Sequence, residues 1–498
     1  MNRKQKLVSN TIISLIYQFT NIICGLILPR YILMAFGSEI NGLVNSITQF
    51  LGFVSLAEGG IGAVVQAVLY KPLANKNWDE VNQIVAATDK FYRKIAYIAV
   101  VYIGGLTIIF SGFKASQFGF VYTTTLILII GISTFVQYYF CMSYRLLLNA
   151  DQLGFIQIGI QIITLIINTI ASVVLIKLNC SIHLVKLVAS VVFLVQPVVL
   201  TTFINSKYNL DRKVVLVGDP IKQKWNGLAQ HISSFILGNT DIAVLTIFST
   251  MTNVSIYSVY NLVVAGIRSI LEKINSGFTS YFGNLFYSEK DNKKILDTFE
   301  VFEWGMHNIV TILFAITGVL ILPFVQIYTN GIEDANYVQP IFGILITMAQ
   351  GAFCLRAPYV IIIAVAGHFK ETQGIAITEA ILNIVISVIL VLKFGLIGVA
   401  IGTLISQSYR TVASAYYLRN NILNRRFAFF VKYILFDILL ALIICVVVYP
   451  LLFTTTNYLY WALEATMVSV ISLLVATVLN MIVFKQYFSV IIKKIRRK

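Results

Sequence analysis

Long apolar runs separated by short polar breaks follow one another along the whole chain. An α-helix needs about 20 apolar residues to cross the ~30 Å hydrocarbon core of a membrane. Fourteen runs of this kind can be marked, near residues 8–33, 42–70, 92–112, 120–146, 153–176, 183–204, 228–249, 255–286, 305–328, 339–366, 374–392, 396–418, 433–453 and 460–484. The pattern predicts an all-α polytopic membrane protein with about 14 transmembrane helices.

Composition supports the membrane assignment and removes several other classes. Of 498 residues, 58% are hydrophobic and 12% charged, with a mean hydropathy of +0.84, whereas roughly 25% of residues are charged in a soluble domain. The five cysteines show no CxxC spacing and the four histidines are scattered, so neither a metal site nor a nucleophile–histidine pair is predicted. We expect no cofactor and no enzymatic activity.

Basic residues are distributed unequally between the two sides of the predicted membrane. If the N-terminus is cytoplasmic, 29 of the 37 Lys and Arg fall on cytoplasmic segments, among them Arg145 and Arg410, and five on outer ones. Cytoplasmic connections of membrane proteins carry this excess. Both termini are therefore predicted in the cytoplasm. The net charge of +16 then faces anionic membrane lipids, and no nucleic acid is needed to explain it.

An internal repeat divides the chain into halves. A shift of 217 residues aligns 69–81 with 286–298, and a shift of 215 aligns 167–178 with 382–393. Similar offsets on two pairs of spans predict two six-helix lobes in a parallel repeat, with two extra C-terminal helices. The predicted divisions are an N-terminal lobe at 1–205, a basic linker at 206–227, a C-terminal lobe at 228–420, spans 13–14 at 421–486 and a basic tail at 487–498.

The eighth span carries charges in the middle of an apolar run. Helical spacing collects its polar residues on one side of the helix, and the chief members of that side are Asn261, Arg268, Glu272, Lys273 and Asn275. A charge at mid-membrane costs at least ~2.5–3.5 kcal/mol, so such groups usually face protein or a wet cavity. Two interpretations stay open: a structural Arg268–Glu272 pair, or a cation that lines a cavity and receives an anionic ligand.

Similar polar positions occur in other spans. Asn41 and Asn45 share one face of the second span, and Glu58 lies beside that face. The face either packs closely against another helix or lines a cavity. Arg30 either snorkels to the interface or faces the cavity. Asp241 is a lone acid of the seventh span, either a salt partner or a coupling site for H⁺ or Na⁺. The same two roles, ion coupling or a structural pair, are expected for Glu58. Arg356 is expected to be another buried cation, and Glu379 and Glu464 are expected to be further lone acids.

Four segments resemble one transporter family. LPRYILMAFGSEINGLV (28–44) and FVSLAEGGIGAVV (53–65) are similar to the N-terminal signature of Wzx-type polysaccharide flippases, within the multidrug/oligosaccharidyl-lipid/polysaccharide exporter superfamily. Asn383 followed by FGLIGVAIGTLIS (394–406) resembles the C-terminal signature, in which Gly395, Gly398 and Gly402 permit a tight turn and close packing. The Asp in NTDIAVL (239–245) matches a recurrent acid of span 7.

The resemblance implies a function and site roles. It implies that the chain moves undecaprenyl-pyrophosphate-linked oligosaccharide from the cytoplasmic to the outer leaflet of a bacterial cell membrane, for surface polysaccharide. Arg268 and Arg30 match cavity cations of spans 8 and 1. With Lys273 and Arg356 they would hold the pyrophosphate, while the polar faces of spans 2, 7 and 8 would pass the glycan during alternating access.

Two alternatives belong to other classes. A cation-coupled multidrug antiporter of the same superfamily predicts twelve spans and a cavity dominated by acids. A membrane polysaccharide polymerase or ligase predicts a large outer loop for its substrate, whereas every outer connection predicted here is short.

Overall fold

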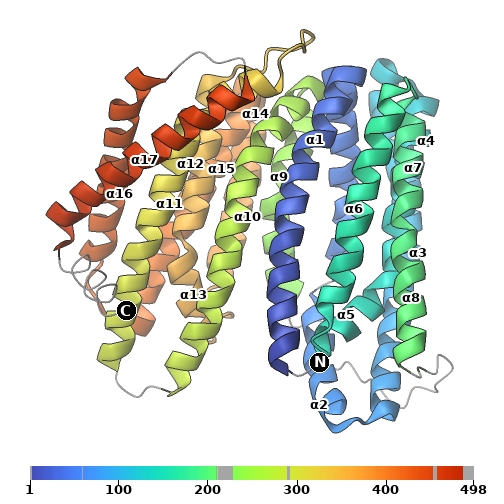
Figure 1. Cartoon of the computed structure of the whole chain (residues 1–498), viewed down its shortest axis with the longest axis horizontal. Coiled ribbons are helices and arrows are strands. Elements are labelled where there is room, and N and C mark those ends of the chain that lie inside the picture. The colour runs from blue at the N-terminus through green and yellow to red at the C-terminus, as the bar shows by residue number, and fades with distance from the viewer. Residues whose placement is uncertain are drawn as a thin grey trace. The chain divides into compact units, whose positions relative to one another are not determined.

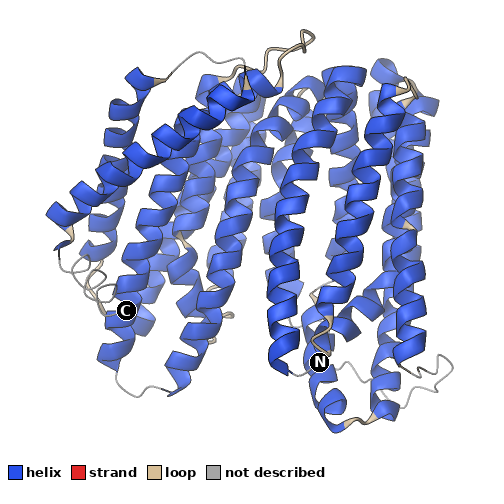
Figure 2. Ribbon diagram, in the orientation of Figure 1, coloured by secondary structure: helices blue, strands red, loops and turns tan. Residues whose placement is uncertain are grey.

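The computed structural model describes residues 3–58, 60–208, 210, 228–288, 292–452 and 457–485. All regular structure in this part of the chain is helical (Figures 1 and 2). Within it, eleven helical segments are long and apolar enough to cross a membrane. The prediction of an all-α polytopic membrane protein is therefore confirmed. The predicted linker at 206–227 and tail at 487–498 lie almost entirely outside the described residues.

Contacts divide the chain into two compact units, Met1–Asn239 and Thr240–Lys498. Unit 1 contains α1 (Arg3–Gly52), α2 (Ile61–Asn75), α3 (Trp78–Phe118), α4 (Phe120–Val136), α5 (Met142–Ala150), α6 (Gly154–Lys177), α7 (Ile182–Phe193) and α8 (Val195–Lys207). The boundary falls inside α9 (Leu228–Phe248). Unit 2 continues with α10 (Met251–Ser288), α11 (Asn292–Tyr328), α12 (Pro340–Leu355), α13 (Ala357–Val365), α14 (Gln373–Phe394), α15 (Leu396–Leu418), α16 (Ala428–Val448) and α17 (Tyr458–Val483).

The first two predicted spans are wrong in outline. One helix, α1, runs from Arg3 to Gly52 and is kinked at Gly37, whose φ of 81° is in the left-handed region. The rest of the predicted span 42–70 is a 3₁₀ turn, Phe53–Glu58, followed by α2. Gly60, with φ 74°, separates the two. Glycine reaches such angles without steric cost, and the apolar run alone does not reveal the break.

Three other predicted spans are interrupted helices. A π-helical turn, Gln137–Cys141, separates α4 from α5. Leu194 separates α7 from α8, and Arg356 separates α12 from α13. The last two breaks each come shortly before a proline, Pro197 or Pro358, which lacks the N–H that a continuous helix requires. A shift of 215 residues, within the predicted repeat, carries Cys141 onto Arg356.

Two helices begin before the predicted spans, and one predicted span is not apolar enough to count among the eleven segments. α3 begins at Trp78 and α11 at Asn292, both more than ten residues before the predicted spans. α15 has the length of a span, but its many buried polar residues keep it outside the eleven apolar segments.

Each unit has its own apolar core. In unit 1, α1 lies along α6 (Figure 1), and a buried cluster joins α2, α3 and α5. In unit 2, α14 packs closely against α15, and α16 and α17 pack against α11 through a second cluster. The polar groups described next are set into these cores.

Candidate functional site

The charges of the eighth predicted span lie on α10. Arg268 Nε donates to Glu272 Oε1 at 2.9 Å, so the two residues pair across one helical turn. The Arg268 side chain keeps 28% of its surface exposed and Glu272 keeps 48%. The pair is therefore not sealed inside unit 2, and its guanidinium can be reached.

Arg268 also lies against an aromatic ring that Arg356 shares. The Arg268 Cζ is 3.7 Å from the centroid of the Phe353 ring, and the Arg356 Cζ is 3.9 Å from the same centroid. Two guanidinium groups this close would overlap on one face, so they lie on opposite faces of the ring. Cations in this position are attracted by the ring electrons. Phe353 therefore joins the two cations.

Arg356 is neutralised by a buried carboxylate from another helix. Its Nη1 donates to Glu379 Oε1 at 2.7 Å and to Gln407 Oε1 at 3.0 Å. Arg410 Nη1 donates to the other oxygen of Glu379 at 2.5 Å. Glu379 is fully buried and bridges two arginines, so the sequence expectation of a lone acid at this position is wrong.

These groups form one site, which we call the arginine cluster: Arg268, Glu272, Phe353, Arg356, Glu379 and Arg410. Three guanidinium groups face two carboxylates, which leaves one net positive charge. Arg356 reaches the cluster because the helix breaks at this residue, at the junction of α12 and α13. A net positive charge within membrane-spanning helices is suited to an anionic ligand.

A second polar site surrounds Asp241 on α9. Tyr257 Oη donates to Asp241 Oδ2 at 2.9 Å, and Thr403 Oγ1 lies 2.8 Å from Asp241 Oδ1. Asn383 Nδ2 donates to Thr403 Oγ1 at 3.2 Å. No cation of the described residues lies within ion-pair distance of Asp241. We call these four residues the Asp241 cluster.

Two buried oxygen atoms in or beside the Asp241 cluster have no hydrogen-bond donor. They are the side-chain oxygens of Asn383, a member of the cluster, and of Ser387, one turn further along α14. One carboxylate with neutral carbonyl and hydroxyl oxygens suits a hard cation such as Na⁺. Among the described residues there is no group of three His, Cys, Asp or Glu that could hold a metal ion, so a transition metal is not suggested.

Glycines bring α14 and α15 together at this cluster. A Cβ on Gly398 would overlap the Leu390 carbonyl, and one on Gly402 would overlap Ser387. Gly395, with φ 53°, makes the turn between the helices. The expected tight turn and close packing are thus confirmed. Thr403, next to Gly402, is placed within reach of Asp241 as a result.

The structure does not bring every predicted residue of α10 into the arginine cluster. Lys273 points away from the core and is exposed. Asn261 is half-buried, and Asn275 has a buried side-chain oxygen without a partner.

The predicted residues of unit 1 lie mostly in its interior. Asn41 is 2% exposed, and Asn45 Nδ2 donates to the Asn41 carbonyl at 2.9 Å. Arg30 is half-buried on α1. Glu58 accepts a hydrogen bond from Tyr92 Oη at 2.8 Å.

The sequence analysis missed the partners of these groups and one further network. His307 Nδ1 contacts Asp437 Oδ2 at 2.5 Å, and its Nε2 contacts Tyr359 Oη at 2.8 Å. All three residues are buried, and they join α11, α13 and α16. Buried Asp437 within an apolar run was the signal that could have identified the network. The network ties α16 to α11 and α13 within unit 2.

No family model and no curated protein matches the chain. Among solved structures, it is similar to the lipid II flippase MurJ in an inward closed conformation. The TM-score is 0.72 at 16% identity, over 96% of this chain and 100% of that one.

The chain is also similar to multidrug transporters. An inward-facing multidrug resistance MATE family transporter of the MOP superfamily matches with TM-score 0.55 at 14% identity, over 83% of this chain and 97% of that one. The eukaryotic MATE transporter AtDTX14 matches with TM-score 0.54 at 12% identity, over 84% and 96%. Identities this low establish fold only. The chain therefore has the all-helical, polytopic fold of these solved membrane proteins.

Proposed function

We propose that this chain is a Wzx-type flippase of the bacterial cell membrane, with both termini in the cytoplasm. It moves undecaprenyl-pyrophosphate-linked oligosaccharide units from the cytoplasmic to the outer leaflet by alternating access, for surface polysaccharide biosynthesis. The observation that carries the proposal is the net positive charge of the arginine cluster, placed midway along α10. A pyrophosphate is an anion that such a cluster can bind.

Arg268 is the proposed contact to the pyrophosphate. It is the most exposed arginine of the cluster, since Arg356 and Arg410 keep only 12% and 11% of their side-chain surfaces exposed. In this structure the Arg268 guanidinium donates a hydrogen bond to Glu272. An arriving pyrophosphate would replace Glu272 and gain charge-assisted hydrogen bonds. Lys273, Arg30 and the polar side chains Asn261, Asn275, Asn41 and Asn45 are proposed to assist substrate binding.

The same fold also serves multidrug transporters, so a cation-coupled antiporter is the second candidate. Binding of organic cations favours acidic side chains. The arginine cluster has the opposite net charge. The fold likeness also extends over 96% of this chain with the lipid II flippase, against 83% with the multidrug transporter. Both observations support the flippase. A polysaccharide polymerase or ligase has no support among these neighbours, which are transporters.

The direct test removes the gene and follows the lipid-linked oligosaccharide. Loss of the protein should make this intermediate accumulate facing the cytoplasm, and surface glycan should fall. Normal surface glycan in the deletion strain would contradict the proposal. Within the restored strain, Arg268→Ala should abolish export while membrane insertion is unchanged. Arg268→Lys separates charge from the bidentate geometry of the guanidinium. Full export by Arg268→Ala would assign Arg268 to structure alone.

The Asp241 cluster is the proposed site of the coupling ion, Na⁺ or H⁺. The buried carboxylate without a cationic partner and the unpartnered Asn383 oxygen support this assignment. Asp241→Asn keeps the shape and removes the charge. It should leave the protein folded and make export independent of the Na⁺ or proton gradient. Export that still follows the gradient in Asp241→Asn would place coupling elsewhere.

A further inference from the structure

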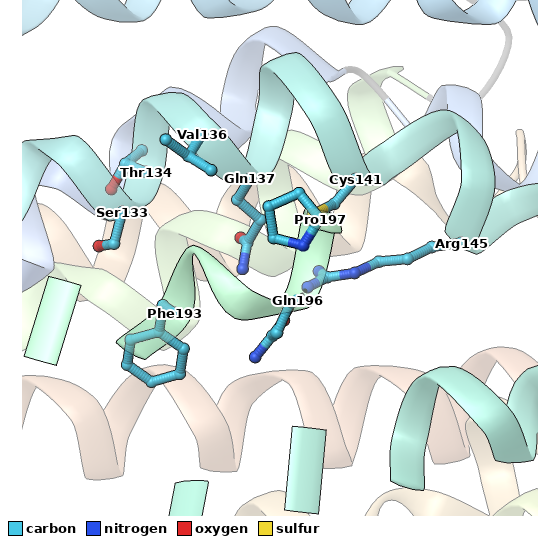
Figure 3. A pocket seen from close by; sticks show the side chains of 9 residues that line it. All are labelled: Ser133, Thr134, Val136, Gln137, Cys141, Arg145, Phe193, Gln196 and Pro197. Atoms are coloured by element: carbon cyan, nitrogen blue, oxygen red, sulfur yellow. Dashed lines mark hydrogen bonds between the residues drawn. The ribbon is translucent and has the colours of Figure 1, made fainter. Parts of the chain in front are cut away.

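A cavity of about 210 Å³ lies inside unit 1, where two of its spans are interrupted (Figure 3). On one side α4 passes into the π-helical turn Gln137–Cys141, and on the other α7 ends at Phe193 before α8 begins. The lining residues are Ser133, Thr134, Val136, Gln137, Cys141, Arg145, Phe193, Gln196 and Pro197. Helix interruptions at corresponding positions of two repeats often mark binding sites in transporters.

Arg145, on α5, is the charged group of this cavity. It lies on the candidate span Phe120–Ala150, five residues before the end of α5 at Ala150. Its Nη2 donates to Gln196 Oε1 at 2.8 Å. Gln196 Nε2 in turn donates to Thr164 Oγ1 at 2.8 Å, and both of these residues are buried. The second bond holds the amide with its oxygen toward the guanidinium.

Arg145 forms no ion pair within the part of the chain that the structure describes, and its buried Nε has no hydrogen-bond acceptor. Glu58, a carboxylate of the same unit, interacts with Arg145 only at a longer range than an ion pair, and accepts a hydrogen bond from Tyr92 Oη. A guanidinium inside a membrane helix normally has a charged partner. The arrangement is therefore built for an anion that comes from outside the chain.

One wall of the cavity lies midway along the candidate span Ile182–Lys207. Gln196 is eleven residues before Lys207, the end of α8, which corresponds to about 16 Å along the helix. It is fourteen residues after Ile182, the start of α7, or about 21 Å. Gln196 is thus near the middle of its span, at the depth where transporters hold their substrates.

The remaining lining groups indicate what carries the anion. Gln137, Ser133 and Thr134 offer amides and hydroxyls that can both donate and accept hydrogen bonds. A phosphate uses donors only, whereas sugar hydroxyls use both kinds of group. Phe193 and Pro197 supply apolar faces for the C–H side of a sugar ring. Since a water takes up about 30 Å³ of the liquid, the 210 Å³ cavity has the volume of about seven waters, which suits one small polar molecule such as a single sugar unit.

We propose that this cavity is a binding site for one acidic sugar unit, whose carboxylate pairs with the Arg145 guanidinium. The choice of a sugar rests on the proposed glycan export, but the anion site does not. The site is separate from the arginine cluster, because it lies in unit 1 and the cluster in unit 2. It selects for acidic glycans.

Binding to the purified full-length protein in lipid nanodiscs tests the proposal. Sodium glucuronate, glucose and inorganic phosphate are titrated separately by calorimetry. Glucuronate should bind at least tenfold more tightly than glucose, which lacks the carboxylate, and than phosphate. Equal affinity for glucose would exclude a role of Arg145 in binding the carboxylate. Equal or tighter binding of phosphate would exclude a sugar as the ligand of the cavity.

Two variants locate the binding. Arg145→Gln should weaken glucuronate binding at least tenfold, whereas Lys90→Gln, which removes an exposed cation of α3, should not change it. If Arg145→Gln does not fold, Gln196→Glu provides the test. It places a carboxylate on the guanidinium, which should raise the melting temperature and abolish glucuronate binding. Glucuronate binding that survives Gln196→Glu would overturn the proposal.

The two proposals fail in different ways. Titration measures no transport, so a protein that exports glycan but binds no glucuronate refutes only this site. A protein that binds glucuronate through Arg145 but exports no glycan refutes only the proposed flippase.

Discussion

Two interrupted spans, Phe120–Ala150 in unit 1 and Pro340–Val365 in unit 2, each place an arginine at or near the break. In unit 2, Arg356 meets the buried carboxylate of Glu379. In unit 1, Arg145 meets the neutral amide of Gln196. The backbone arrangement is similar, but the charge of the partner differs. An arginine paired with a fully buried carboxylate contributes to the architecture, whereas we propose that Arg145, with its amide partner, keeps its charge for a ligand.

The largest effect should follow removal of the carboxylate in unit 2. Glu379→Gln leaves Arg356 and Arg410 buried without a counter-charge, and breaking a buried ion pair costs about 3–5 kcal/mol. Thermal unfolding of the purified protein should show a large loss of stability. The double variant Glu379→Gln with Arg356→Gln should recover part of it, because one unpaired charge is gone. If the double variant is no more stable than Glu379→Gln, the pair does not act as a unit.

Removal of the shared ring should have an intermediate effect. Phe353→Leu keeps an apolar side chain but loses the ring between Arg268 and Arg356. Each cation–ring contact is worth about 0.5–2 kcal/mol, so the loss of two contacts should lower the free energy of unfolding by roughly 1–4 kcal/mol. Phe353→Tyr keeps the ring and should resemble the parent protein. Equal stability of the Leu and Tyr variants would show that the stacked geometry contributes nothing.

The smallest effect should follow removal of the arginine in unit 1. Arg145→Met breaks no ion pair, and a water in the polar cavity can replace the donor to Gln196. We expect the free energy of unfolding to change by less than about 1 kcal/mol, since exchanging a buried charge for an apolar group is often neutral. Chemical denaturation of Arg145→Met and Glu379→Gln side by side measures the difference between their free energies of unfolding. A loss as large as that of Glu379→Gln would end the distinction between the two arginines.

The sequence was sufficient to predict properties that depend on neighbouring residues. Apolar length predicted most spans, and spacing of four residues predicted the contact between Arg268 and Glu272, found at 2.9 Å. The glycines before Thr403 predicted the close approach of α14 to α15. Each follows from local geometry, which the order of residues determines.

Properties that depend on remote segments could not be predicted. Nothing near Glu379 in the sequence indicates that two arginines from other helices meet it. Hydropathy does not reveal the π-helical turn Gln137–Cys141, because its residues are as apolar as a continuous helix requires. The count of basic residues assigned Arg145 and Arg410 to cytoplasmic segments, and it could not show that both side chains take part in networks between helices.

The contact between α14 and α15 has a mechanical consequence. Neither helix can slide past the other, because Gly398 and Gly402 bring the backbones too close for any displaced side chain to pass. Asn383 and Glu379 are one turn apart on α14, as Thr403 and Gln407 are on α15. The two helices therefore move as one rigid unit. This unit carries Asn383 and Thr403 of the Asp241 cluster, and one turn away it carries Glu379 of the arginine cluster and Gln407, which binds Arg356. Any tilt that repositions one cluster must displace the other in the same movement.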